Sequence, residues 1–496
     1  MKQLFLTGLF LTLYTLSFAQ KPGWHHLDLE KDGVFGISAD KAYNELLKGK
    51  PHKTVIVAIV DAGIDTNHED LKQVLWTDPK TGQHGWNWIA KETGREDLTN
   101  LIVKNNERAA FYDSLQYTVV PEQYRAGYQA YRKTNHDLPP QLADKRETLE
   151  KLIKEISLAQ KITDTILQKL NKTSPAISDF KSYQATDSLQ IKLIKKIVKR
   201  LDIYPDWQTY KQAEITGIIQ AAQYHLDHGL NPGDKEPDTD KGNADIFPDK
   251  LGPTNNPNLT AYHGTHVAGI IGAVRNNGIG MNGVADDVKI MMFKTIGNVR
   301  ELKDRYIAGS IYYAVDHGAK IINLSFGKPY TWAKKEVDEA VKYAMKHDVL
   351  IVHAAGNSGE NLDKEESYPN KIYADGTGAA AAWINVGASS FKDDAQLAVS
   401  FSNYGLKTVD VFAPGAQIYS TLPYNQYTSW DGTSMAAPVV AGLAALIREY
   451  YPKLTAVQVR DIILKTVVKR DVLKDKCVTS GVVNAYNALK LAATYK

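Results

Sequence analysis

The sequence predicts an α/β protein: a three-layer α/β/α fold with a mostly parallel central sheet, into which an α-helical subdomain is inserted. Three observations predict it: short apolar runs rich in β-branched residues, amphipathic helical patterns between these runs, and a long charged stretch without strand signals. Strands buried on both faces of a sheet are continuous apolar runs, and their alternation with helices is typical of βαβ units.

Several runs have the length and composition of buried strands, namely residues 54–60, 289–293, 320–324, 349–353, 384–388 and 409–413. Helical patterns over 304–317 and 334–347 separate some of these runs. Ligand sites of parallel sheets lie beyond the carboxyl ends of the strands. We therefore expect Asp61, Ser325 and Asn357, which follow such runs, to lie near a common site.

Residues 92–249 interrupt the alternation, because they are charged and carry helical rather than strand patterns. Apolar residues mark helix faces over 149–170, 191–201 and 215–226, and residues 231–258 form a return loop rich in Pro, Gly, Asn and Asp. The lysines and arginine of 192–200 fit the solvated face of a helix, or a docking surface for an anionic partner. We expect a helical insertion between residues 54–91 and 250–490, which form one α/β domain.

The N-terminus has the pattern of a secretory signal peptide. Lys2 precedes the apolar run from Leu4 to Phe18, and small residues end at Ala19. A membrane anchor is the alternative, but the run of about fifteen residues is shorter than the roughly twenty that span a bilayer. We expect residues 1–19 to be a signal peptide cut after Ala19, residues 20–53 to be an N-terminal extension, and the protein to be secreted or periplasmic.

Composition excludes several classes of protein. Apolar residues make up 43%, charged residues 23%, and the net charge is +3, values that are ordinary for a globular protein and do not indicate nucleic-acid binding. Cys477 is the only cysteine, so no intramolecular disulfide can form. After the N-terminal run no stretch approaches membrane-spanning length. We expect no membrane span, and a monomer.

Three strings carry the groups of a nucleophilic hydrolase. Residues 57–65 (VAIVDAGID) supply an acid, residues 263–269 (HGTHVAG) supply an imidazole, and residues 432–438 (GTSMAAP) supply a hydroxyl. A serine hydroxyl needs a base to take its proton, and the base needs a carboxylate to fix its tautomer. Asp61 and Ser434 are the candidate acid and nucleophile, and the spacing leaves the base open between two histidines of the second string.

These strings resemble those of the subtilisin-like serine peptidases, in which the acid, base and nucleophile follow one another in this order. The resemblance implies that His263, rather than His266, is the base and that Asp61 orients it. It also implies a serine endopeptidase that cleaves protein or peptide substrates through an acyl-enzyme. A zinc site at the His-x-x-His pair is the alternative, but no third ligand follows in a recognisable pattern.

The resemblance extends to the groups around the nucleophile. Asn357, in the string of residues 354–359, matches the amide that binds the oxyanion together with the backbone N–H of Ser434. The residues that match the substrate-binding segments are Ser325, Phe326, Gly327, Ala354, Ala355, Gly356 and Ser367. Acidic residues at 363, 365 and 366 indicate either a preference for basic substrates or solvated loop charges, and we favour solvated charges.

Residues 275–280 (RNNGIG) resemble the calcium loop of the same family. The resemblance implies a structural Ca²⁺ held by Asp70 with Asn277, Ile279 and Met281 of the loop, and calcium binds such carboxylate, amide and carbonyl oxygens. A plain turn is the alternative.

Two other functions stay open. One is a non-catalytic or latent protein of the same fold, whose helical insertion contacts a partner. The other is an acyl transfer restricted to one dedicated partner. The completeness of the catalytic strings favours a general endopeptidase.

Overall fold

The computed structural model describes residues 22–88, 122–185, 187–201, 206–211, 215–216, 219, 222–223, 226, 258–296, 302–328, 331 and 333–495. The expected signal peptide and nearly all of the return loop at 231–258 lie outside these residues, and so does much of the helix expected over 215–226.

Among the described residues, nine strands form one sheet in the order β10-β11-β7-β6-β5-β4-β1-β3-β2, in which only the β10–β11 pair is antiparallel. The strands are β1 (Val55–Asp61), β2 (Gly85–Asn87), β3 (Val288–Lys294), β4 (Ile321–Leu324), β5 (Leu350–Ala354), β6 (Trp383–Ser389), β7 (Val411–Pro414), β10 (Val468–Lys469) and β11 (Gly481–Val482). The expected strands are thus present, and the largest shift is at β7, which begins at residue 411 instead of 409. The predicted α/β class with a mostly parallel sheet is confirmed.

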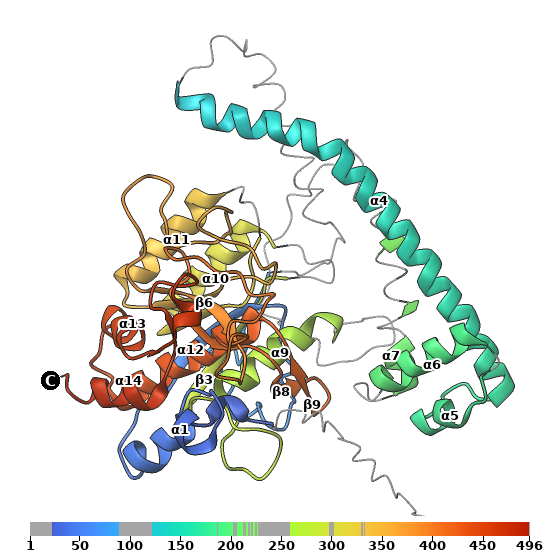
Figure 1. The fold of residues 1–496 in the computed structure, drawn as a ribbon, viewed down its shortest axis with the longest axis horizontal. Coiled ribbons are helices and arrows are strands. Elements are labelled where there is room, and N and C mark those ends of the chain that lie inside the picture. The colour runs from blue at the N-terminus through green and yellow to red at the C-terminus, as the bar shows by residue number, and fades with distance from the viewer. Residues whose placement is uncertain are drawn as a thin grey trace, which may run out of the picture.

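Helices cover both faces of this sheet (Figure 1). The helices of the sheet-bearing part are α1 (Leu29–Asp32), α2 (Ala39–Ala42), α9 (Asn258–Gly272), α10 (Asp304–Asp316), α11 (Lys334–Lys346), α12 (Thr433–Tyr450), α13 (Ala456–Lys465) and α14 (Ala485–Ala492). A π-helical turn, η2 (Tyr43–Leu47), and short 3₁₀ turns, η1 (Trp24–His26) and η6 (Asp471–Leu473), complete the set, and β8 (Ile418–Leu422) and β9 (Gln426–Trp430) form a separate hairpin.

The central strand shows how the three layers arise. Val57 and Ile59 of β1 belong to a core shared with α9, α12, α13 and α14, whereas Ala58 and Val60 belong to a second core shared with α10 and α11. Alternate residues of a strand point to opposite faces of the sheet. An uninterrupted apolar strand is therefore what a sheet covered on both faces requires.

The N-terminal extension packs into the main core. Trp24 is fully buried, and its indole Nε1 donates to the carbonyl oxygens of Ala416 and Gln417 at 3.2 Å. Ile37 and Leu47 join the same core as α12 and α14. Residues 24–47 are thus part of the main core of the fold, and sequence patterns alone did not indicate this role.

The helices α4 (Glu122–Leu170), α5 (Ile177–Ser182), α6 (Ser188–Leu201) and α7 (Trp207–Lys211) lie between β2 and α9 in the chain. They build a small core of their own, in which Phe180 and Trp207 are buried with ring centroids 5.2 Å apart. Tyr262 of α9 packs against this core. The inserted helices therefore contact the residue that directly precedes His263.

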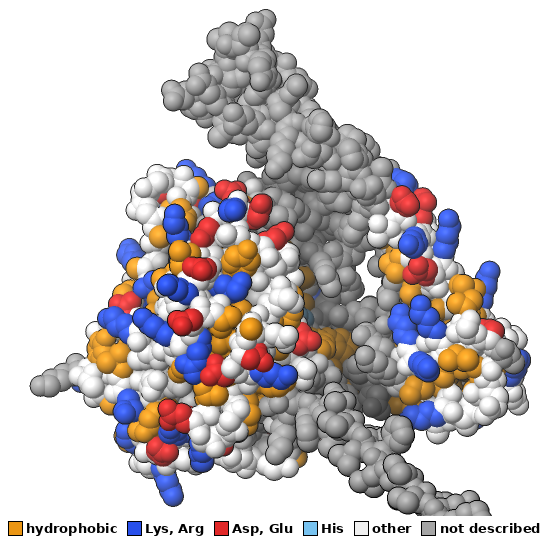
Figure 2. Space-filling model, in the orientation of Figure 1, with side chains coloured by type: hydrophobic (Ala, Val, Ile, Leu, Met, Phe, Trp, Pro, Cys, Tyr) orange, Lys and Arg blue, Asp and Glu red, His pale blue; other side chains and the backbone are white. Residues whose placement is uncertain are grey.

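Charged side chains of both signs are interspersed over the sheet-bearing part on the face shown in Figure 2. Within the described part of the chain, no helix is both long enough and apolar enough to cross a membrane.

Candidate active site

The acid and the imidazole meet where β1 ends against α9. Asp61 is the last residue of β1, and His263 lies in the second turn of α9. A Cβ atom on Gly264 would overlap the carbonyl oxygen of Gly63, so the helix can approach the strand end this closely only with glycine there. The helix begins at Asn258, so it extends upstream of His263.

The Asp61 carboxylate binds one nitrogen of His263. Its two oxygens lie 2.8 and 2.9 Å from Nδ1, and Oδ1 also accepts the N–H of Ala62 at 2.7 Å. Asp61 is fully buried, and the His263 side chain is 35% exposed. Because an ionised carboxylate only accepts hydrogen bonds, Nδ1 carries a proton, and Nε2 of the neutral ring keeps the lone pair that a base needs.

Ser434 lies in the first turn of α12, where Ser325 holds it by two hydrogen bonds. The Ser434 hydroxyl donates to the carbonyl oxygen of Ser325 at 2.9 Å, and the Ser325 hydroxyl donates to the carbonyl oxygen of Ser434 at 2.9 Å. Asn323 donates from Nδ2 to the Ser325 hydroxyl at 2.9 Å. A hydroxyl has a single proton, so the Ser434 O–H must turn away from Ser325 before His263 can take that proton.

Asn357 is oriented by Thr433, the residue before Ser434. The Asn357 Oδ1 atom accepts the backbone N–H of Thr433 at 2.8 Å and its hydroxyl at 2.9 Å, and that hydroxyl accepts the N–H of Gly356 at 3.0 Å. With the oxygen engaged on this side, the Nδ2 end of the amide faces the other way. Thr433 belongs to the string of residues 432–438, but sequence patterns offered no reason to assign a role to its hydroxyl.

A second amide braces the loop that carries Asn357. Asn403 accepts the N–H groups of Ser358 and Glu360 at Oδ1, at 3.0 and 2.9 Å, and donates from Nδ2 to the carbonyl oxygen of Ala355 at 3.0 Å. No motif surrounds Asn403, and sequence reasoning missed it. Backbone hydrogen bonds from Gly359 to Phe401 and from Asn403 to Gly356 join the same two segments, and the Asn403 side chain adds to them.

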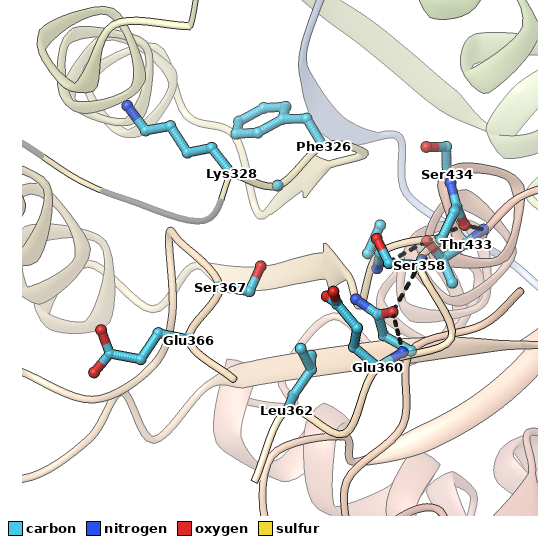
Figure 3. A pocket seen from close by; sticks show the side chains of 14 residues that line it. Phe326, Lys328, Ser358, Glu360, Leu362, Glu366, Ser367, Thr433 and Ser434 are labelled. Atoms are coloured by element: carbon cyan, nitrogen blue, oxygen red, sulfur yellow. Dashed lines mark hydrogen bonds between the residues drawn. The ribbon is translucent and has the colours of Figure 1, made fainter. Parts of the chain in front are cut away.

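A cavity of about 330 Å³ opens beside Ser434 (Figure 3). Its lining consists of Phe326, Gly327, Lys328, Ala354, Gly356, Asn357, Ser358, Glu360, Leu362, Glu366, Ser367, Asn403, Thr433 and Ser434. Five of the residues expected to bind substrate are among them. The other two, Ser325 and Ala355, are buried and do not line it; Ser325 holds Ser434.

The second histidine of the motif has a structural environment. His266 is fully buried, its Nε2 lies 3.1 Å from the carbonyl oxygen of Thr428, and its ring stacks on Trp430 with centroids 4.6 Å apart. Burial lowers the pKa of His266 to about 3. The ring is therefore neutral at neutral pH, and it supports the hairpin that carries Trp430.

The residues expected to hold calcium come together around Asp70. Its carboxylate accepts the Asn277 amide at 2.6 Å and the backbone N–H of Met281 at 3.0 Å, and the Asn277 oxygen accepts the N–H of Ile279 at 3.1 Å. A carboxylate offers about four lone-pair positions and an amide oxygen two. Lone pairs therefore remain on both groups, and the donor set fits a calcium ion in its chemistry.

Comparisons with known proteins identify the family of the chain. Residues 52–486 match the model of the family described as the subtilase family, Peptidase_S8. The chain is 34% identical over 275 residues to Subtilisin Savinase of Lederbergia lenta, covering 55% of this chain and 88% of that protein. It is 40% identical over 185 residues to Thermitase of Thermoactinomyces vulgaris, covering 37% and 60%.

A further relative is the Cell wall-associated protease of Bacillus subtilis (strain 168), 39% identical over 227 residues, which are 46% of this chain and 23% of that protein. The chain thus spans less than two thirds of the length of this relative and of Thermitase. A solved structure of proteases from Pseudoalteromonas arctica PAMC 21717 has a TM-score of 0.50 at 18% identity, covering 95% of this chain and 96% of that one, and it supports the fold.

The buried state of His266 predicts a pH dependence of stability. Its pKa in the folded protein, about 3, lies below the ordinary value of 6.5, so the unfolded chain binds the proton more readily. Its contribution to the free energy of unfolding is therefore lost as the pH falls from about 6.5 towards 3, by up to about 1.4 kcal/mol per pH unit.

Urea unfolding of the wild type and of His266→Gln from pH 8 to pH 4.5 measures this slope. Above pH 7 the substitution lowers the free energy of unfolding by a constant amount. Below pH 6.5 the free energy of unfolding decreases less steeply with falling pH in the variant than in the wild type. Parallel curves down to pH 4.5 would contradict the buried neutral histidine.

Proposed function

Because the chain belongs to the subtilase family, we propose that it is a serine endopeptidase that uses Asp61, His263 and Ser434 as a catalytic triad. The observation that carries this proposal is the hydrogen bond from His263 Nδ1 to the buried Asp61, together with the place of Ser434 on the wall of a cavity. Proteins or peptides are the substrates.

In the proposed reaction the Ser434 oxygen attacks the carbonyl carbon of the scissile peptide bond, while His263 Nε2 takes the hydroxyl proton. Asp61 holds the ring and stabilises the imidazolium that forms. His263 then gives the proton to the leaving amine, which leaves an ester on Ser434. Water, deprotonated by the same nitrogen, attacks the ester, and the proton returns to Ser434 as the acid leaves.

The negative charge on the attacked carbonyl oxygen needs donors that are already in place. We assign this role to Asn357 Nδ2 and to the backbone N–H of Ser434. The side chain of Asn357 is fixed through its oxygen by Thr433, and the N–H groups of the first turn of α12 have no acceptor within the helix. Loss of a single side-chain donor of this kind lowers kcat by about 100-fold to 1,000-fold.

The substrate backbone would lie between two segments beside the nucleophile. Residues 325–327 follow β4, and residues 354–356 end β5 and continue into the Asn357 turn. An extended peptide can add to exposed backbone of this kind as a further strand. The cavity beside it then receives one substrate side chain.

We also propose that Ca²⁺ binds at Asp70 with Asn277, Ile279 and Met281, where it would tie the loop to the turn after β1. The support is the convergence of these residues and the unused lone pairs of their oxygens. The ion would be structural, because Asp70 is fully buried and lies outside the set of residues that line the cavity.

The N-terminal residues 1–19 support export to the periplasm or the medium. Their charged start, apolar run and small-residue end are typical of a signal peptide. The fluid outside the cytoplasm also supplies calcium and protein substrates.

A serine-directed fluorophosphonate tests the triad. Wild-type protein is labelled and loses its hydrolysis of casein, because only an activated serine attacks the phosphorus, and Ser434→Ala is not labelled. Mass spectrometry locates the adduct, and Ser429→Ala in β9 is the matched control that keeps the label. An unlabelled wild-type protein that still folds would favour the latent binding protein.

Thermal unfolding with and without calcium tests the metal site. At about 100 times its Kd, calcium adds about 2.7 kcal/mol, which raises Tm by about 5 °C or more for a domain of this size. The Asp70→Asn variant loses this response. A wild-type Tm that is equal in excess EDTA and in millimolar calcium would contradict calcium binding.

A further inference from the structure

We propose that Glu360 makes the peptidase selective for lysine or arginine at the P1 position, the residue on the N-terminal side of the cleaved bond. The inference rests on the proposed peptidase function. Glu360 lines the cavity beside Ser434. Figure 3 shows its carboxylate directed into the space between Ser358 and Ser367.

Two other acidic groups of this loop, those of Asp363 and Glu366, are engaged elsewhere. The Asp363 carboxylate accepts the N–H groups of Lys407 and Thr408 and the Thr408 hydroxyl. Glu366 accepts the hydroxyl of Tyr368, and Figure 3 shows its carboxylate at the outer end of the cavity, pointing away from Ser434. Of these carboxylates, Glu360 is the one that faces an incoming side chain.

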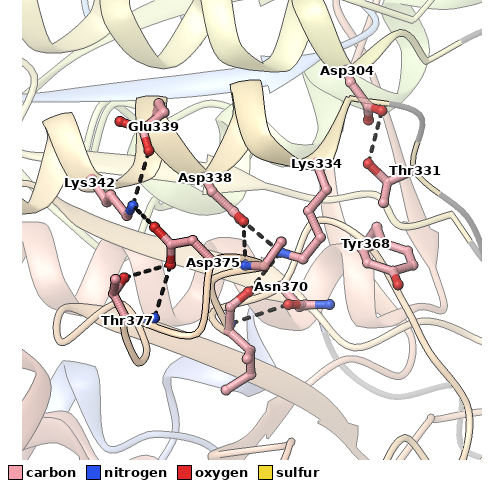
Figure 4. Close-up of polar contacts among 12 residues, drawn as sticks. Asp304, Thr331, Lys334, Asp338, Glu339, Lys342, Tyr368, Asn370, Asp375 and Thr377 are labelled. Carbon is pink, nitrogen blue, oxygen red and sulfur yellow. Dashed lines mark hydrogen bonds and ion pairs between the residues drawn. The ribbon is translucent and has the colours of Figure 1, made fainter. Parts of the chain in front are cut away.

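Among the described residues of the lining, the one basic side chain, that of Lys328, does not cancel this charge. The ammonium of Lys328 lies 2.7 Å from the Asp304 carboxylate and donates to the carbonyl oxygen of Leu302 at 2.8 Å. Lys328 and Asp304 are 5% and 4% exposed, and Figure 3 shows the ammonium directed away from Ser434. The Asp304 carboxylate also accepts the hydroxyl of Thr331 at 2.9 Å (Figure 4). The cavity therefore presents a net negative charge to the substrate.

The walls match the rest of a basic side chain. Phe326, Ala354 and Leu362 contribute apolar surface to the lining of the cavity. Lysine and arginine bury their methylene stems on apolar surface while their charged ends stay near a polar partner. An uncharged side chain of the same length would instead strip water from Glu360 without returning a charge or a hydrogen bond.

Cleavage of succinyl-Ala-Ala-Pro-X-p-nitroanilides with X as lysine, methionine or glutamate measures this selectivity. In wild type, kcat/KM for lysine exceeds that for methionine, an uncharged and similarly unbranched side chain, and the ratio falls by about fivefold to tenfold in Glu360→Gln. In Glu360→Lys, the preference reverses towards glutamate, a gain that misfolding cannot produce. Raising the salt concentration reduces the wild-type ratio, since the carboxylate is exposed to solvent.

Glu365→Gln is the matched control, because Glu365 is exposed and does not line the cavity, and its lysine-to-methionine ratio stays that of wild type. Fluorophosphonate labelling is run on each variant. Labelled proteins whose ratios are equal in wild type, Glu360→Gln and Glu360→Lys would overturn the role of Glu360 alone. A wild type that is neither labelled nor active would overturn the peptidase function itself.

Discussion

The hydrogen bond between Asp61 and His263 is the contact on which the rest of the site depends. It joins residues 202 positions apart in the sequence and links the end of β1 to α9. Because Asp61 is buried, its charge is stabilised by His263 and the N–H of Ala62, so the pair is also a constraint on folding. The inserted helices fall within this interval of the chain, and they leave the pair intact.

Hydrogen bonds with neighbouring residues fix the remaining reactive groups. Ser325 holds the backbone of Ser434, Thr433 orients the amide of Asn357, and Asn403 braces the loop in which that amide lies. These supports come from the residue after β4, from the start of α12 and from a loop after β6. The parallel sheet brings them together near the carboxyl ends of its strands. A preformed site of this kind leaves little reorganisation for the reaction except the rotation of the Ser434 hydroxyl.

Sequence predicted the parts of the fold that depend on local pattern. Buried parallel strands such as β1 and β5 are continuous apolar runs, so their positions could be predicted within a few residues. The hairpin strands β8 and β9 were missed because Thr, Ser and Gln dilute their apolar pattern. The burial of Trp24 depends on contacts with residues near 416, which no local pattern reveals. Asn403 and Glu360 were missed for the same reason, since each gains its role from distant segments. The site residues inside motif strings remain predictions that the geometry supports.

The central claim is that the Asp61 carboxylate fixes the tautomer of His263, and the kinetics of Asp61→Asn test it most directly. An asparagine of nearly the same shape can donate a hydrogen bond to Nδ1, which would put the proton on Nε2 and remove the base. The account predicts a fall in kcat of about 10,000-fold near pH 7 with a much smaller change in KM. A fall of less than about tenfold in a correctly folded variant would contradict it.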